Sequence, residues 1–278
     1  MTAVDLNTPP MQPPPGWADP AAAIAMATDM PVPQMRPTPV SEYDLPIGLI
    51  NARGELVTSV SIREMTGFDE EEMARHDIRK NVAVWVTKLL LLTVETIGGE
   101  KPDAEVIRNL LIGDRDALVN FVRRTTYGDL YEFELTCSVC KGKSKIGIDL
   151  STEIQQTPIE DPMVRTFEIP LRRGVAKVRF LTGADQEAFS ETLSKQPKTQ
   201  AEIDTLMLAR SVIEIDGQLT FGDENAVRRL PAADRSTLSE FIGTKQPGPQ
   251  TMTPIPVNCA TCGEEYPITP GIGDLFRI

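Results

Sequence analysis

The placement of the four cysteines constrains this chain more than any other feature. They form two C-x-x-C pairs, Cys137/Cys140 and Cys259/Cys262, whose first members are 122 residues apart. One pair supplies two ligands, and zinc in structural sites takes four. The economical arrangement is that the two pairs face each other and share one ion, so that segments far apart in the sequence meet. An ordinary zinc ribbon separates its pairs by only about 15–20 residues.

Each cysteine pair lies at the same place in one half of a sequence that reads as if it were written twice. The offset between matched residues grows smoothly along the chain, from 116 to 120 and then to 122 at the cysteines. A chance match would not keep this order, so we predict a duplication. The alternative is that the matched motifs are ordinary helix starts, which Thr and Asp favour as caps. The matched motifs are Thr66-Gly67-x-Asp69 with Thr182-Gly183-x-Asp185, and Asp114-Arg115 with Asp234-Arg235.

Length and hydropathy narrow the class of protein. A chain of 278 residues can bury a core without disulfide staples. The sequence has no run of about 18 apolar residues, and its first residues lack the basic and apolar regions of a secretory signal. We therefore expect no membrane partner and residence in a reducing cytosol, where C-x-x-C pairs indicate metal ligands rather than structural disulfides.

Charge and motif content argue against two further classes. The net charge is −12, from 40 acidic and 28 basic residues, whereas a surface that follows nucleic-acid phosphates needs the opposite balance. Common nucleotide-binding and hydrolase motifs are missing, and the single histidine, His76, leaves little scope for His-dependent catalysis. The acidic run from Asp69 to Glu72 is explained by a helix N-terminus. We expect no enzymatic activity, no nucleic acid and no small-molecule substrate.

Residues 1–46 differ from the rest of the chain, since they hold 11 of its 23 prolines. Proline at this density blocks helix formation and sheet pairing, and it favours an extended, solvated backbone. We predict an extended N-terminal arm that binds partner proteins. The alternative is a disordered tail, which such a composition often forms.

The remainder predicts an α+β fold of two tandem duplicated modules, residues 47–160 and 161–278, related by a pseudo-twofold axis. Each module is expected to begin with a hairpin whose apolar residues alternate, to continue through helices that begin after a Thr cap, and to end in a hairpin that carries a cysteine pair. The expected elements, first module then second, are hairpins at 45–62 and 167–181, long helices at 80–96 and 201–213, and cysteine hairpins at 130–150 and 254–268.

A strand, a C-x-x-C pair with a glycine after it and a second strand are typical of a zinc knuckle. Gly142 and Gly263 are expected to take the left-handed conformation that the bend needs. A closed four-ligand zinc site has no open position, so we expect it to be structural rather than catalytic. Two alternatives remain, disulfides at oxidised knuckles and a redox-active pair, although redox pairs open a helix and these follow strands. The expected zinc ligands are Cys137, Cys140, Cys259 and Cys262.

Several short motifs together resemble a known family. Their order looks like that of the T-even-type baseplate hub assembly chaperones and baseplate proteins of contractile-tailed bacteriophages, which also occur in phage-derived injection systems. The resemblance spans about residues 45–278 and leaves out the arm. It implies a protein without enzymatic activity that acts in tail or baseplate assembly, either transiently or as a retained component. The motifs that carry it lie at Arg63 to Glu71, Leu89 to Leu92, Asp114 to Leu118, Tyr127 to Phe133, the first cysteine pair and Ile148 to Leu150.

These observations together predict a structural or assembly protein of a contractile phage tail. We expect it to act in the baseplate hub, to bind other tail and baseplate proteins through its arm, to be present in the host cytoplasm during assembly and to stay in the virion tail. The alternative from another class is a zinc-ribbon adaptor in transcription or RNA handling, which a basic, aromatic face would favour. An enzyme that uses the zinc is a third alternative.

Overall fold

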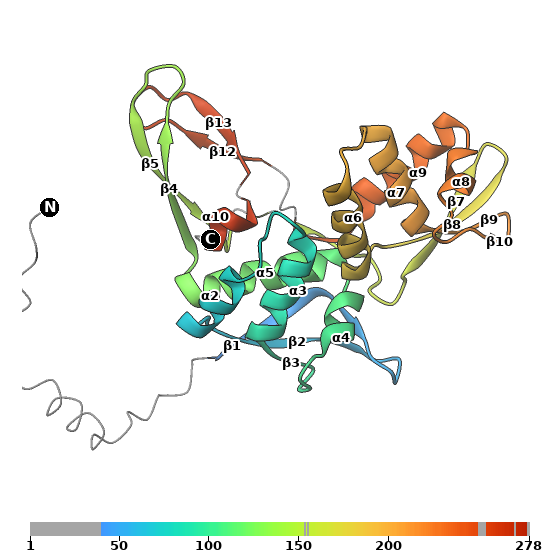
Figure 1. The fold of residues 1–278 in the computed structure, drawn as a ribbon, viewed down its shortest axis with the longest axis horizontal. Helices are drawn as coiled ribbons and strands as arrows, with labels where there is room; N and C mark the ends of the chain where they lie inside the picture. Colours follow the sequence, from blue (N-terminus) through green and yellow to red (C-terminus); the bar gives the residue numbers. More distant parts are fainter. Residues whose placement is uncertain (1–39, 153, 155, 250–253, 270, 277–278) are drawn as a thin grey trace, which may run out of the picture. The chain divides into compact units, whose positions relative to one another are not determined.

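The structure is a computed structural model that describes residues 40–152, 154, 156–249, 254–269 and 271–276. It confirms the α+β class, with helices packed against several small antiparallel sheets (Figure 1). Most of the predicted arm, residues 1–39, lies outside the described part. Residues 40–46 do not belong to an arm of the expected kind, because they form the beginning of a long strand in which Leu45 is buried.

The first body of the molecule is a three-stranded sheet with four helices. Strand β2 (Leu56–Arg63) lies between β1 (Val40–Ile50) and β3 (Val94–Ile97) and is antiparallel to both. Apolar faces of α3 and α5 close over this sheet, and Trp85, Leu89 and Leu118 lie in the core they share with it. The helices are α2 (Gly67–Ala74), α3 (Val82–Thr93), α4 (Ala104–Asn109) and α5 (Ile112–Tyr127).

The second body repeats this composition with its own core. Strands β7 (Thr166–Leu171), β8 (Gly174–Arg179), β9 (Val212–Ile215) and β10 (Gln218–Leu219) form an antiparallel sheet in the order β10-β9-β8-β7. Val178, Leu208 and Leu238 are fully buried between that sheet and its helices. The helices are α6 (Gly183–Lys195), α7 (Gln200–Ser211), α8 (Glu224–Arg228) and α9 (Ala232–Lys245).

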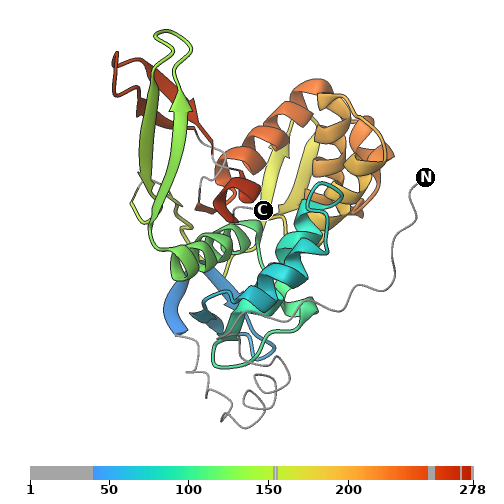
Figure 2. The same ribbon diagram turned by 60° about the vertical axis from the view of Figure 1, so that its left-hand side comes forward.

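The two cysteine hairpins form a third part of the molecule. Strands β4 (Leu130–Thr136) and β5 (Lys143–Asp149) make the longer hairpin, and β12 (Ile255–Asn258) and β13 (Glu265–Ile268) make the shorter one. They lie side by side in both views (Figures 1 and 2) and share a small core around Ile148 and Val257. The first and second halves of the sequence therefore meet at these hairpins.

Two further elements cross between the halves. The short strand β6 (Gln156–Thr157) pairs with β11 (Gly248–Pro249). Helix α10 (Ile272–Phe276), near the end of the sequence, packs into the core of the first body, where Phe276 contacts the rings of Trp85 and Tyr127 edge-on. A boundary near residue 160 therefore does not separate two independent cores. Among the described helices, none combines the length and apolar character needed to span a bilayer.

The long helices predicted at 80–96 and 201–213 end earlier than expected. Helix α3 ends at Thr93 and α7 at Ser211, and in each case the next residues form a strand. The reason is local: both continuations contain β-branched residues, which suit a pleated surface better than a helix. Each pairs with the second strand of the preceding hairpin. The prediction that both helices continue through these apolar residues was therefore wrong.

The same contacts stabilise both bodies. Thr66 and Thr182 each form a capping box with the aspartate three residues later, and that aspartate also pairs with an arginine of the preceding strand. A second shared contact lies deeper. Arg115 Nη2 donates to the Ala83 carbonyl and to Thr87 Oγ1, both at 3.0 Å. In the second body the same arrangement recurs, with Arg235 Nη2 donating to the Ala201 carbonyl at 3.1 Å and to Thr205 Oγ1 at 2.7 Å.

Candidate metal centre

The four cysteine sulfurs meet at the ends of the two cysteine hairpins. Every Sγ lies within 4.8 Å of the other three. The Sγ atoms of Cys137 and Cys262 are 3.6 Å apart, and those of Cys140 and Cys259 are 3.8 Å apart. Each of these short distances joins the first cysteine of one pair to the second cysteine of the other. All four cysteines are free, and a disulfide would need a separation of about 2.05 Å.

The two knuckles have the same backbone hydrogen bonds. Cys137 N donates to the Gly142 carbonyl at 2.9 Å, and Lys141 N donates back to the Cys137 carbonyl at 3.0 Å. In the second knuckle Cys259 N donates to the Glu264 carbonyl at 2.8 Å, and Gly263 N donates to the Cys259 carbonyl at 2.8 Å. These tight turns follow strands and open no helix, which agrees with the argument against a redox-active pair.

The expectation for the two knuckle glycines was right for one and wrong for the other. Gly263 has a φ of 77°, in the left-handed region, but the matching residue of the first knuckle is Lys141, with a φ of 60°. Gly142 is required for a different reason. A Cβ there would lie 2.8 Å from Thr261 Oγ1 and 3.1 Å from Cys140 Sγ, so the missing side chain lets the second knuckle approach the first.

This donor set fits a four-thiolate zinc. Zinc–sulfur bonds of about 2.3 Å in tetrahedral geometry place the sulfurs about 3.8 Å apart, close to the two distances between the knuckles. Backbone N–H groups also point at the sulfurs, since Cys140 N lies 3.3 Å from Cys137 Sγ and Gly142 N lies 3.4 Å from Cys140 Sγ. Such bonds stabilise thiolates, the form in which cysteine binds a metal.

The electrostatics of the cluster also favour a bound cation. Backbone N–H donation from Cys262, followed by the Ser144 hydroxyl, lowers the pKa of Cys259 to about 6. The Tyr266 hydroxyl, 3.0 Å from Cys137 Sγ, is the main reason why the pKa of that thiol is also lowered. At Cys262 the N–H of Glu264 acts in the same direction, but burial and the neighbouring sulfurs outweigh it and raise the pKa to about 12. Four thiolates so close together repel one another unless a cation lies between them.

Polar contacts between the knuckles complete the site, and the sequence pattern did not single out the residues that make them. Tyr266 of the second hairpin accepts a hydrogen bond from Ser138 N of the first at 2.9 Å. Ser144 of the first hairpin accepts one from Ala260 N of the second at 3.1 Å. Each hairpin thus supplies one hydroxyl to the other knuckle. Both residues lie in the predicted strands, but only the facing of the two hairpins gives them this role.

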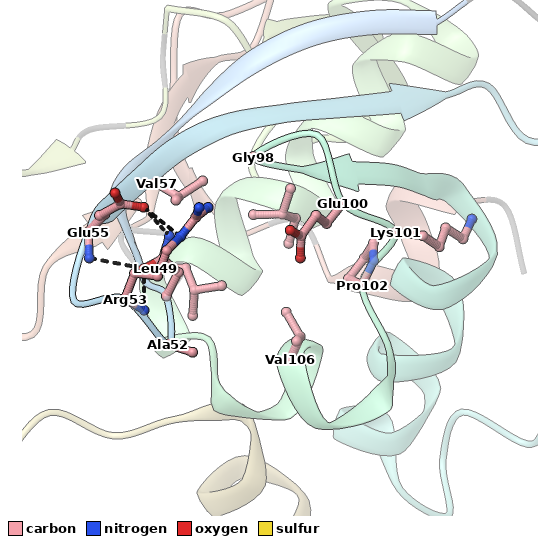
Figure 3. Close-up of a pocket in the computed structure, with 12 residues that line it drawn as sticks. Leu49, Ala52, Arg53, Glu55, Val57, Gly98, Glu100, Lys101, Pro102 and Val106 are labelled. Carbon is pink, nitrogen blue, oxygen red and sulfur yellow. Dashed lines mark hydrogen bonds and ion pairs between the residues drawn. The ribbon is translucent and has the colours of Figure 1, made fainter.

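Other candidate residues lie away from the cysteines. His76 follows α2, where its Nε2 is 3.5 Å from Glu72, and Asp69 serves the capping box, as its position in the sequence indicated. A pocket of about 500 Å³ lies at the end of the β1–β2 hairpin. Figure 3 shows that Arg53 and Glu55 at its edge pair with each other. Within the described part of the chain, the cysteines are the cluster of three or more side chains whose ligand atoms converge on one point.

Comparison with models of known protein families gives a match over most of the chain. A family model described as T4 bacteriophage base plate protein matches residues 50–277. The chain belongs to this family. The match covers the second body, both cysteine hairpins and the first body from the last residue of β1 onward, which confirms the predicted resemblance. No curated protein and no solved structure matches the chain.

Membership in a base plate family indicates a structural role in the phage tail, in contact with other tail proteins. It also disfavours the zinc-ribbon adaptor of transcription or RNA handling, which the sequence had left open. All four cysteines of the cluster lie inside the range that the family model matches.

Proposed function

We propose that this protein is a structural or assembly component of the baseplate hub of a contractile phage tail, without enzymatic activity. The family match over residues 50–277 is the observation that carries the proposal. In the proposed course of events, the protein is present in the host cytoplasm during assembly and remains in the tail of the finished virion. Mass spectrometry of purified particles tests retention. Its presence in assembly intermediates and absence from mature particles would instead identify a transient chaperone.

A single zinc ion bound by Cys137, Cys140, Cys259 and Cys262 is the second part of the proposal. The separations between sulfurs, the free state of all four and the N–H groups directed at them support it. A closed four-thiolate zinc supplies structural stability, because it holds ligands from distant parts of the chain in one place. Here it would join two short hairpins that share only a small core. Metal analysis of reduced, purified protein should give one zinc per chain, and a value well below one contradicts the site.

The third part is that the two bodies and their hairpins descend from one duplicated module, covering about residues 47–160 and 161–278. The support is the repetition of specific contacts: the capping boxes, the arginine–aspartate pairs, the knuckle hydrogen bonds and the contacts of Arg115 and Arg235. The twofold relation is proposed for the cysteine cluster alone. The helical bodies meet through different surfaces of each half.

The last part concerns partners. We assign the proline-rich segment that precedes β1 the task of binding other tail or baseplate proteins, on the basis of its composition. Since residues 40–46 belong to β1, a clean deletion ends at residue 39. Such a protein should keep the melting temperature of the full chain but lose its association with tail partners in co-purification. Undiminished co-purification would refute this assignment.

A further inference from the structure

The two bodies meet where the first turns of α6 enter a groove formed by α3, α4 and α5. A short backbone ladder fixes the position of α6: Ile112 N donates to the Leu181 carbonyl at 3.1 Å, and Gly183 N donates to the Leu110 carbonyl at 3.0 Å. Arg115 packs directly on Gly183, where a Cβ would lie 2.4 Å from the guanidinium. We call this contact the helix junction.

Charge complements shape in the helix junction. Glu187 of α6 accepts hydrogen bonds from Thr87 of α3 and from Arg108 of α4, the latter at 2.9 Å. Arg115 Nε donates to Gln186 at 3.1 Å. The first five residues of α6 thus supply a glycine, a glutamine and a glutamate, and these lie against Arg108 and Arg115.

The second body contains the matching set of helices α7, α8 and α9, and several residues on the surface between them, which we call the open groove, are exposed. Arg228 and Arg235 occupy the positions of Arg108 and Arg115, each 120 residues later. Arg235 forms the same bonds to α7 that Arg115 forms to α3. Yet the surroundings differ in exposure: Leu111 is buried in the helix junction, whereas Pro231, Ala232 and Ala201 around the second groove are exposed.

The first body contains the matching helix, and that helix is also uncovered. Gly67, Glu70 and Glu71 of α2 take the places of Gly183, Gln186 and Glu187, each 116 residues earlier. All three are exposed, and apart from the neighbouring residues and the backbone of the helix itself, no heavy atom of the described residues lies within 4 Å of where a Cβ on Gly67 would be. Phe68, next to Gly67, is 78% exposed. The acidic start of α2 and the arginines of the open groove thus match the two sides of the helix junction. Among the described residues, their contacts lie within their own bodies, since Arg228 pairs with Glu224 of α8 and Glu70 accepts a hydrogen bond from Tyr127.

We propose that a second copy of this chain fills the open groove, with α2 of one copy docked between α7, α8 and α9 of the next. In this contact Glu71 pairs with Arg228, and Gly67 lies against Arg235, as Gly183 lies against Arg115. The inference rests on the proposed duplication, because it transfers a contact seen within the chain to one between chains. The interface is heterologous, so repetition gives a closed ring if the rotation closes and an open chain if it does not.

A charge exchange in the full-length protein tests this proposal. Sedimentation velocity over a range of concentrations should show that the wild type self-associates. Glu71→Arg and Arg228→Glu should each raise the dissociation constant by about 30-fold or more, because each sets like charges against each other. An equimolar mixture of the two variants should recover association, since Arg at 71 then meets Glu at 228. Glu240→Arg, five residues beyond Arg235 on α9 and exposed, is the matched control and should associate as the wild type does.

Gly67→Leu supplies a second variant that leaves charge unchanged. The residue is exposed with open space around it among the described residues, so the body should fold and melt normally while the side chain obstructs docking. A monomeric wild type at every concentration, or association that survives Glu71→Arg and Gly67→Leu, would overturn the proposal. Either result would leave the baseplate role standing, because that role is decided by the presence of the protein in particles.

Discussion

The two halves of this protein are joined at two places of very different chemistry. The helix junction consists of backbone ladders, a buried arginine and a glycine, and it uses different surfaces of the two halves. The cysteine cluster joins the ends of two hairpins, one from each half, which share a core with three buried apolar residues. The first can form by folding alone. The second brings four sulfurs together. If it holds the proposed zinc, its strength depends on the metal and can vary independently of the first.

Loss of the metal site should have the largest local effect. We expect Cys137→Ser to abolish protection from hydrogen exchange in β4–β5 and in β12–β13 together, because a metal ion bound by both hairpins contributes directly to their folding. The helix junction should keep its protection. Val139→Ala, in the same knuckle but 63% exposed, is the control that should change neither hairpin. Loosening of the nearer hairpin alone would show that the pairs do not share an ion.

Arg115→Ala should cause the largest loss of global stability at the helix junction. The side chain is fully buried and donates to the carbonyls of Ile107 and Ala83 as well as to Thr87. Its removal leaves buried acceptors unsatisfied, so the free energy of unfolding in urea should fall by about 4 kcal/mol. Arg235→Ala removes the matching bonds at a partly exposed site, and about 1 kcal/mol is expected. If both variants lost the same free energy of unfolding, burial in the helix junction would add nothing to the stabilisation that Arg115 provides.

The sequence predicted the cysteine cluster better than the helix junction, for physical reasons. Metal ligands are few, chemically distinct and fixed in spacing, so Cys137 and Cys259 could be paired across 122 residues. The helix junction depends on Gly183 and Arg115. The matching positions in the other half, Gly67 and Arg235, carry the same residue types in similar local motifs. The local sequence does not show which glycine and which arginine are buried in a contact and which are exposed. Only the arrangement of the two bodies decides that.

The hairpins and caps were predicted for a similar reason, since alternation and Thr-x-x-Asp spacing are local signals. Strands β3 and β9 were missed because they continue directly from helices, and their pairing with β2 and β8 is a tertiary contact. The docking of α10 into the first core was also beyond local pattern, because five residues around Phe276 carry too weak a signal on their own.

The pH dependence of stability should show a contribution from the residue next to Arg115. Asp114 is fully buried and accepts hydrogen bonds from Ile47 N and Gly48 N, and burial raises its pKa from 3.8 to about 6 despite those bonds. A raised pKa in the folded state means that folding favours the protonated form. This stabilisation is complete below about pH 4 and is lost as the pH rises through 6.

Comparison with Asp114→Asn isolates that contribution. The free energy of unfolding of the wild type, relative to the variant, should fall by at most about 3 kcal/mol between pH 4 and pH 7. Urea titrations of both proteins across this range provide the measurement. A difference that stays constant, or one that grows with pH, would show that the buried carboxyl is not protonated in the folded protein.

The smallest expected effect gives the sharpest contrast between the halves. Gly183→Ala places a methyl group 2.4 Å from the Arg115 guanidinium, which is fixed by its own hydrogen bonds, so stability should fall by about 1–3 kcal/mol. Gly67→Ala makes the same change at the uncovered copy, where helix propensity alone should raise stability by up to about 1 kcal/mol in dilute solution. Thermal unfolding at low protein concentration measures both. If the two variants changed stability in the same direction, the covered and uncovered helix starts would be energetically alike, and the helix junction could no longer serve as the template for contact between chains.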